Sequence, residues 1–285
     1  MDIGVQLWSY TSDEQDISFR DRIKLASEMG FNSIEYAGGY EEIEPDELFS
    51  ILKKLNLTLP SAHVAFNKLD ESLPYLASVG VKHIICPSAP YNSHEEALII
   101  AKRLNEFGEK CRPYGIKTGF HNHAGDYFVE NGKAIADTLY DNTNPETVII
   151  QLDIGHAVGG GVDPYDYLER YKGRIESIHI KENKGSLVLD KPRSYYDKGP
   201  KWNFTIDENG KKVFEKAFYE EKVKHEAMAV AMGTSIIDWA KIIKVAKEQY
   251  PEVTCIIERE VSYNRPKDRL ACIKEDLDYI RGCNV

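Results

Sequence analysis

Short apolar segments recur along the chain, roughly one in every thirty residues, and most of them are apolar on both faces of a strand. Eight such segments can be recognised: residues 3–7, 33–36, 59–64, 83–86, 117–120, 148–152, 177–180 and 254–257. Runs of this length and character are typical of strands that are covered on both sides, as in a parallel sheet. The pattern therefore predicts eight buried parallel strands.

Amphipathic helical patterns separate these segments. They cover residues 19–29, 46–55, 71–79, 94–111, 133–140, 164–171, 236–249 and 267–280. Gly30 and Gly80 follow two of them, and Pro164 occupies the first position of another, as helix ends and starts favour. A strand followed by a helix, eight times over, predicts a single-domain (β/α)8 TIM barrel over residues 1–285. An open doubly wound sheet is the second choice, because the chain lacks a glycine-rich dinucleotide-binding turn.

One interval breaks this alternation. Between the seventh strand and the helix that starts at 236 lies an insertion, residues 184–232, which contains Tyr195, Tyr196 and Trp202. Alternating apolar residues around Asn209-Gly210 predict a β-hairpin over residues 204–214. We expect the insertion to form a lid or substrate wall on the catalytic face, with a dimer contact as the alternative.

Charge and composition restrict the class of partner. Lys and Arg number 36 against 46 Asp and Glu, and the resulting net charge of -10 argues against nucleic acid as a partner. The five cysteines include no CxxC pair, and most of them are expected to be buried, reduced thiols. No targeting segment or membrane-spanning run is recognisable, so we expect a cytoplasmic protein with no membrane partner. A small neutral or metal-chelated substrate fits this charge better.

Polar residues follow each of the last four strand segments. They are His121, Asn122 and His123, then Asp153 and His156, then His179 and Lys181, and finally Glu258. The C-terminal ends of the strands of a TIM barrel meet in one pocket, so these side chains are expected to converge. A carboxylate at the end of a buried strand is costly unless a cation or hydrogen-bond donors receive it.

His121, Asp153, His179 and Glu258 together provide two imidazoles and two carboxylates, a ligand set for one divalent ion: Mn, Co, Zn, Fe or Mg. His121 is preferred to His123, which is expected to lie farther from the centre of the barrel mouth. Taken singly, two of the four have simpler explanations. His179 would be a satisfied core histidine, and Glu258 would pair with Arg259 or Lys181.

The motifs occur in an order that resembles a known family. They are Gly-Val-Gln-Leu-Trp at 4–8, Ile-Glu-Tyr at 34–36, Ser-Ala-His at 61–63, Phe-His-Asn-His at 120–123, Leu-Asp-Ile-Gly-His-Ala at 152–157, His-Ile-Lys-Glu at 179–182, Met-Gly-Thr-Ser-Ile-Ile-Asp-Trp at 232–239 and Ile-Ile-Glu-Arg-Glu at 256–260. The set is similar to the sugar phosphate isomerase/epimerase family of xylose-isomerase-like TIM barrels, which has inosose dehydratase and ketose epimerase relatives. Almost the whole chain takes part, except the insertion.

The resemblance implies one divalent metal held by a Glu, Asp, His, Glu set from strands five to eight. Asp153, His179 and Glu258 match the last three positions, whereas His121 stands where ketose epimerases have Glu. The implied function is a metal-dependent isomerase or epimerase acting on a sugar, sugar phosphate or keto-sugar through a metal-stabilised enediolate. Because His121 replaces a proton-shuttling Glu, the alternative is a dehydratase or lyase acting β to a carbonyl, on a keto-cyclitol or 3-keto-glycoside.

The expected catalytic residues are Glu258, His123, His156 and Lys181. Glu258 or His123 would be the general base, while His156 and Lys181 would hold the substrate. The alternatives are packing of His156 in the loop after strand six, and an ion pair of Lys181 with Glu182 or Asp153.

Three further residues are expected to contact a carbohydrate substrate: Trp8, Glu35 and His63. Trp8 would otherwise be a core aromatic, and Glu35 would otherwise be held by Arg or Lys. Surface roles are expected for the remaining histidines, His83, His94 and His225. An abasic-site endonuclease would share the barrel, but the net charge of -10 opposes it. A homo-oligomer is possible.

Overall fold

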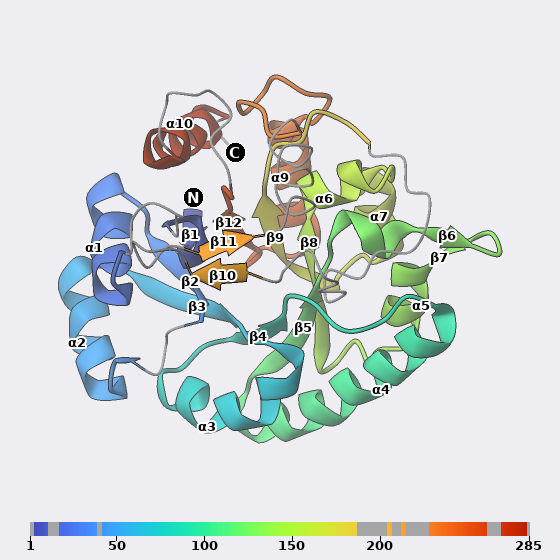
Figure 1. Cartoon of the computed structure of the whole chain (residues 1–285), viewed down its shortest axis with the longest axis horizontal. Helices are drawn as coiled ribbons and strands as arrows, with labels where there is room; N and C mark the ends of the chain where they lie inside the picture. The colour runs from blue at the N-terminus through green and yellow to red at the C-terminus, as the bar shows by residue number, and fades with distance from the viewer. Residues whose placement is uncertain are drawn as a thin grey trace.

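Eight parallel strands close into a barrel in the order β1-β12-β9-β8-β5-β4-β3-β2. The computed structural model describes residues 3–10, 17–38, 42–186, 204–206, 212–214, 228–260 and 269–283. In Figure 1 the helices form a ring around the strands, so the apolar strand faces are covered on the outside. The predicted TIM barrel is confirmed.

The barrel strands coincide with the eight predicted segments to within a few residues. They are β1 (Ile3–Gln6), β2 (Ser33–Ala37), β3 (Thr58–His63), β4 (His83–Cys86), β5 (Lys117–His121), β8 (Val148–Asp153), β9 (Ile175–Ile180) and β12 (Thr254–Ile257). The helices are α1 (Phe19–Met29), α2 (Pro45–Leu55), α3 (Leu69–Ser78), α4 (His94–Cys111), α5 (Ile135–Asp141), α6 (Ile154–Gly159), α7 (Pro164–Arg170), α9 (Trp239–Gln249) and α10 (Arg269–Gly282).

Local signals account for several of the helix ends. The side chains of Ser18 and Ser93 accept hydrogen bonds from the first turns of α1 and α4. Gly30 ends α1 with a φ of 94°, a left-handed conformation that glycine adopts without strain. Pro45 and Pro164 begin α2 and α7, where the missing N–H costs no helical hydrogen bond.

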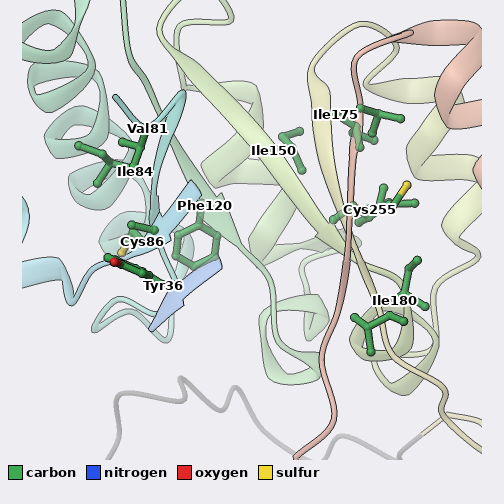
Figure 2. Close-up of a cluster of buried hydrophobic side chains, with 14 of the residues drawn as sticks. Tyr36, Val81, Ile84, Cys86, Phe120, Ile150, Ile175, Ile180 and Cys255 are labelled. Carbon is green, nitrogen blue, oxygen red and sulfur yellow. The ribbon is translucent and has the colours of Figure 1, made fainter. Parts of the chain in front are cut away.

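The apolar core lies between the strands and the surrounding helices. Figure 2 shows part of it, with Ile84 and Phe120 on one side of the barrel and Ile150 and Ile180 on the other. All four side chains are at most 1% exposed. Four of the cysteines are buried and all five are free thiols, as predicted.

The structure departs from the predicted elements at two places. Residues 154–159 form the short helix α6 directly after β8, where a loop was expected. Residues 133–134, predicted as the start of a helix, instead form β7 (Lys133–Ala134), which pairs with β6 (Val129–Glu130). Both segments are too short to show a helical or strand period of their own.

The predicted surface role of His83 is wrong. Its ring is buried at the start of β4, and Nε2 lies 3.1 Å from Oε2 of Glu176 on β9. No local pattern pointed to the Glu176 contact, because that partner lies 93 positions away. His94 is only partly buried, and its two ring nitrogens contact Thr138 and the carbonyl oxygen of Glu130. His225 lies outside the described residues.

The predicted hairpin within the insertion is present as β10 (Phe204–Ile206) and β11 (Lys212–Phe214), which pair antiparallel. Its Asn209-Gly210 turn lies outside the described residues, as do Tyr195, Tyr196 and Trp202. At the base of the insertion the backbone N–H of Lys184 donates to the carbonyl oxygen of Met228, 2.9 Å away. No helix in the described ranges is long and apolar enough to cross a membrane.

Candidate metal centre

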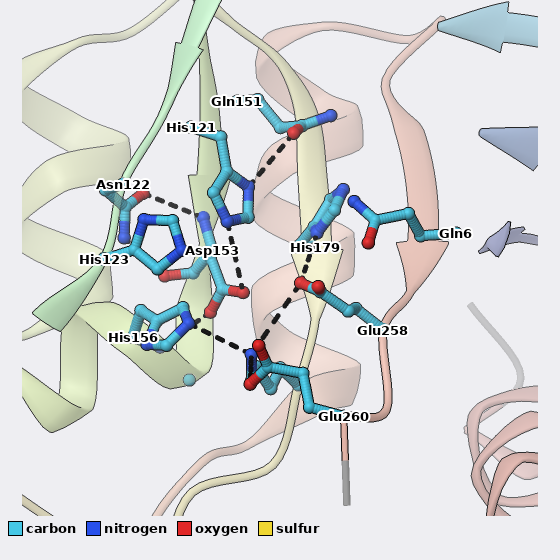
Figure 3. Close-up of polar contacts among 12 residues, drawn as sticks. Gln6, His121, Asn122, His123, Gln151, Asp153, His156, His179, Glu258 and Glu260 are labelled. Carbon is cyan, nitrogen blue, oxygen red and sulfur yellow. Dashed lines mark hydrogen bonds and ion pairs between the residues drawn. The ribbon is translucent and has the colours of Figure 1, made fainter. Parts of the chain in front are cut away.

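The four predicted ligands converge at the C-terminal end of the barrel. His121, Asp153, His179 and Glu258 come from β5, β8, β9 and the residue after β12. Each places one ligand atom so that the four atoms lie within 4.8 Å of one another, and all four side chains are buried. Figure 3 shows them facing a common point. The barrel thus joins residues that are up to 137 positions apart in the sequence, from 121 to 258.

Asp153 is held rigidly at the junction of β8 and α6. One of its oxygens, Oδ1, accepts the backbone N–H of His156 at 2.6 Å and so caps α6. The side-chain amide of Asn122 exchanges two hydrogen bonds with the Asp153 backbone, at 2.9 and 3.0 Å. These contacts fix the direction of the carboxylate.

The second oxygen of Asp153 shows that the site fits a cation. Oδ2 is buried, accepts no hydrogen bond from the described residues, and lies 4.0 Å from Nε2 of His121. A buried carboxylate oxygen without a donor is costly unless a positive charge is placed beside it. A divalent ion among the four ligands would satisfy it.

His179 lies between two carboxylates. Its Nδ1 is 3.1 Å from Oε2 of Glu258, and its Nε2 is 2.8 Å from Oε1 of Glu35. Burial alone would lower the pKa of the ring, but the charge of Glu35 and the bond to Glu258 raise it to about 10. The Glu35 carboxylate accepts a hydrogen bond from the Nε2–H of His179, which leaves Nδ1 for a metal once that nitrogen has lost its proton, an arrangement common around metal-binding histidines.

Glu35 lies in the barrel interior, below the ligands, and is fully buried. It accepts hydrogen bonds from Gln6, Ser61 and Gln151 as well as His179. Burial would raise the pKa of this carboxyl, but His63, His179 and the hydrogen bond from Ser61 outweigh it and lower the pKa. The expectation that Arg or Lys would hold Glu35 is wrong.

His63 belongs to the same interior layer. Its Nε2 lies 2.6 Å from Oε1 of Gln151, and its ring stacks on that of His179 at a centroid distance of 5.2 Å. Burial lowers its pKa, so the ring is neutral. Both Glu35 and His63 therefore contact the candidate ligand His179 directly. Contact of either residue with the substrate stays a prediction.

Lys181, His156 and His123 lie beside the ligands. Nζ of Lys181 is 3.0 Å from Nε2 of His156 and 3.8 Å from Oε2 of Glu258, and it also donates to Glu260. Burial would lower the pKa of Lys181, but Glu258 and Glu260 raise it, so the ammonium is charged. Lys181 therefore pairs with Glu258, as the simpler explanation of that carboxylate had it, and with Glu260, and not with the alternatives Glu182 or Asp153.

His121, His123 and His156 also bring three ligand atoms close together. The ammonium of Lys181 lies against His156, and it would repel a second cation there. The set containing Asp153 and Glu258 is the better metal site, because it supplies negative charge. His123 has a pKa of about 4, lowered by burial and then by Lys181, so it is neutral.

The structure contradicts three of the simpler roles considered from the sequence, those of Arg259, His156 and Trp8. Arg259, expected as a partner for Glu258, instead forms two hydrogen bonds with Asp276 of α10, at 2.7 and 2.8 Å. His156 lies on α6 rather than in a loop. Trp8 follows β1 and is 46% exposed, so it is not a core aromatic.

A family model described as the xylose isomerase-like TIM barrel matches residues 23–283. The chain belongs to the xylose isomerase-like TIM barrel family. Its relatives include the inosose dehydratase of Mesomycoplasma hyopneumoniae strain J, 26% identical over an alignment of 210 positions that covers 63% of this chain and 69% of that protein. The inosose dehydratase of Clostridium beijerinckii is 30% identical over an alignment of 186 positions that covers 62% of this chain and 51% of that protein.

Solved structures share the family fold. A sugar phosphate isomerase/epimerase from Parabacteroides distasonis superposes with a TM-score of 0.70 at 19% identity, covering 97% of this chain and 92% of that one. The 3-keto-D-glucoside 4-epimerase of E. coli gives 0.65 at 14% identity, covering 99% and 100%. At these identities the likeness concerns the fold.

Several residues around the candidate metal centre were not identified from the sequence. Gln6, Ser61 and Gln151 form the layer that holds Glu35, and Glu260 pairs with Lys181. A signal was present for Gln151, a polar residue within an apolar strand two positions before Asp153, and therefore on the same face. A separate cleft, lined by Ser33, Thr58 and Thr254 among others, opens at the opposite end of the barrel.

Proposed function

We propose that this protein is a divalent-metal-dependent enzyme that isomerises or epimerises a sugar or keto-sugar by moving a proton next to a carbonyl group. The observation that supports this most is the convergence of His121, Asp153, His179 and Glu258, with an unsatisfied carboxylate oxygen on Asp153. Two imidazoles and two carboxylates suit Mn, Co, Fe or Zn. When bound, such an ion polarises a substrate oxygen and makes the adjacent C–H more acidic.

We assign proton removal to His123 or Glu258. His123 is neutral because its pKa is about 4, and its ring lies beside that of His156 at a centroid distance of 4.7 Å. For Glu258, burial would raise the pKa, but Lys181 and the bond from His179 lower it, so it is ionised. The enediolate formed from the substrate then takes the proton back on another carbon or on its other face.

His156 and Lys181 are assigned to substrate binding. A lysine ammonium only donates hydrogen bonds, so Nε2 of His156 accepts from Nζ of Lys181 at 3.0 Å. In its neutral form His156 then carries its proton on Nδ1, which can donate to a substrate oxygen. The ring and the ammonium together would orient one end of the sugar.

Pairing of Lys181 favours an uncharged substrate over a sugar phosphate. Its positive charge is already neutralised by Glu260 and by Glu258. A phosphate placed here would meet these carboxylates as well as the ammonium, and like charges at this range repel. We therefore place sugars, keto-sugars and cyclitols ahead of phosphorylated sugars.

Elimination of water is the second candidate reaction. It is favoured by the names of the relatives at 25 to 31% identity, which are inosose dehydratases. Here the proton would also be removed next to a carbonyl, but a hydroxyl β to it would leave. Lys181 would supply a proton to that hydroxyl.

One experiment tests both candidates. Metal-loaded protein is incubated with a panel of neutral keto-sugars, keto-cyclitols and their phosphates in deuterium oxide, with the D153N variant as the control. An isomerase incorporates deuterium at carbon without loss of water, whereas a dehydratase gives an unsaturated product. If wild-type protein binds no divalent metal, or neither exchanges nor eliminates with any member of the panel, the proposed function is refuted.

A further inference from the structure

Gln151 occupies a central position beneath the ligands. It lies on β8, two residues before Asp153, and is fully buried. Its amide oxygen is 3.1 Å from Nδ1 of His121 and 2.6 Å from Nε2 of His63. Its amide nitrogen is 2.7 Å from Oε2 of Glu35 and 3.0 Å from Oγ of Ser177. Both lone pairs and both N–H groups of the Gln151 amide therefore have partners among the buried residues beneath the ligands.

Only one orientation of this amide is chemically consistent. If it were rotated by half a turn, its oxygen would face the carboxylate oxygen of Glu35 at 2.7 Å, two acceptors in contact. With the nitrogen toward Glu35, the oxygen faces both imidazoles. His121 and His63 must then each donate to it.

The orientation fixes the tautomer of His121. Because Nδ1 donates to Gln151, the neutral ring has its lone pair on Nε2. Nε2 is the atom that points toward Asp153, at 4.0 Å from Oδ2. The ring thus presents its lone pair to the place where the cation would bind.

The side-chain amide of Gln151 is also linked to the second imidazole ligand, His179, through Glu35. It donates to Glu35, and Glu35 in turn accepts from Nε2 of His179 at 2.8 Å. Gln151 therefore contacts Glu35, the partner of His179, and also the ring of His121. Figure 3 shows Gln151 on the interior side of His121, away from Glu260 and the barrel mouth.

We infer that Gln151 is a positioning residue of the metal centre, which selects the Nε2 lone pair of His121 for the cation and, through Glu35, holds His179 in place. The inference rests on the proposed metal site. Gln151 does not touch the substrate or the metal in this role. It is assigned on its four contacts, none of which was apparent from the sequence.

Gln6 provides a matched comparison. It is also a buried glutamine in the same layer, and its Nε2 lies 3.0 Å from Glu35 and 2.9 Å from Nδ1 of His63. Its hydrogen-bond partners within the described residues are Glu35 and His63, and His121 is not one of them. The Q151L and Q6L variants remove similar volumes and similar contacts to Glu35, but only Q151L removes the acceptor opposite His121.

The test measures zinc affinity by competition with a chromophoric chelator, and histidine tautomers by long-range ¹H–¹⁵N NMR of the apoprotein. Metal-ligand supporting contacts are typically worth about 10- to 100-fold in affinity, so Q151L should bind zinc at least about tenfold more weakly than Q6L. His121 should carry its proton on Nδ1 in wild type and Q6L, and lose this preference in Q151L. In Q151E the protonated acid can donate to Glu35 through one oxygen and accept from His121 through the other, so the Nδ1 tautomer should return.

Two results would overturn the inference while leaving the proposed function intact. One is wild-type protein that binds zinc but carries the His121 proton on Nε2. The other is a Q151L variant that matches Q6L in affinity. If Q151L does not fold, the wild-type tautomer and the Q151E spectrum still decide. Wild-type protein that binds no zinc would refute the proposed function instead.

Discussion

At the scale of single residues, Asp153 shows how a binding site can oppose stability. Its carboxyl group is fully buried, and burial raises its pKa to about 7, an effect that Lys181 only partly offsets. The pKa of the folded state therefore lies above the ordinary value of 3.8. As pH rises from about 4 to 7, the unfolded chain loses this proton before the folded chain does, and the free energy of unfolding falls.

Replacing Asp153 by Asn should stabilise the metal-free protein. The D153N side chain carries no charge to bury, so we expect its free energy of unfolding above pH 7 to exceed that of wild type by up to about 4 kcal/mol. Below pH 4 the two should converge. Urea unfolding of D153N and wild type in the presence of chelator, at pH 4 and at pH 8, measures the difference in free energy of unfolding at each pH. D166N, at an exposed position on α7, is the control and should change little. Equal or lower stability of D153N at pH 8 would contradict the prediction.

Metal binding should release protons. In the metal-free protein the pKa of His179 is about 10 and that of Asp153 about 7, and both must lose their protons to bind a cation. We expect about two protons released per ion below pH 6 and about one near pH 8, so that affinity rises with pH throughout. Calorimetry in buffers of different ionisation enthalpy counts them. Affinity that does not change between pH 6 and 8 would refute this.

At the scale of elements, the contact of α6 with the end of β9 positions the substrate-binding residues. Gly155 lies so close to β9 that a Cβ atom would meet the carbonyl oxygen of Lys181 at 2.2 Å. Asn183 also donates to the Gly155 carbonyl oxygen, at 3.0 Å. This close approach keeps His156 of α6 within 3.0 Å of Lys181.

The G155A variant should separate these two elements. Overpacking of a tight contact costs about 1–3 kcal/mol, and the backbone is the obstacle here, so we expect a loss in the upper part of that range. The pair of His156 and Lys181 should also be disturbed, which would raise KM more than it lowers kcat. G185A is the matched control, because nothing lies within 4 Å of its new Cβ. Equal unfolding curves for G155A and G185A would refute the contact.

At the scale of the whole molecule, a cation at this site would link four strands of the barrel that are separate in the sequence. Such binding stabilises the folded state alone, since the unfolded chain has no assembled site. The closed barrel and the metal site are therefore expected to reinforce each other.

Removal of the metal should lower the melting temperature. At a free ion concentration of 100 Kd the stabilisation is about 2.7 kcal/mol, which for a chain of this size corresponds to roughly 4–5 °C. Differential scanning calorimetry with zinc or manganese, and then with excess chelator, measures the difference. D153N should show no such shift. A wild-type melting temperature that is the same with and without metal would contradict the prediction.

The sequence by itself determined the barrel and grouped the four candidate ligands. Eight apolar runs separated by helical patterns report directly on burial, and residues at the ends of parallel strands must meet at one edge. His121, Asp153, His179 and Glu258 could be grouped for that reason, because strand position alone brings them together. The helix α6 was not predicted, because a segment of six residues is too short to show a helical periodicity.

Only the tertiary structure decided what surrounds each ligand. Gln151 meets Glu35 from 116 positions away, and Lys181 pairs with Glu260 rather than with Glu182. These contacts depend on the register between strands and on which rotamers the closed barrel permits, and neither leaves a trace in the local pattern of polar and apolar residues. The sequence thus determined the groups that meet at the site, while packing decided their hydrogen-bond partners and hence their protonation.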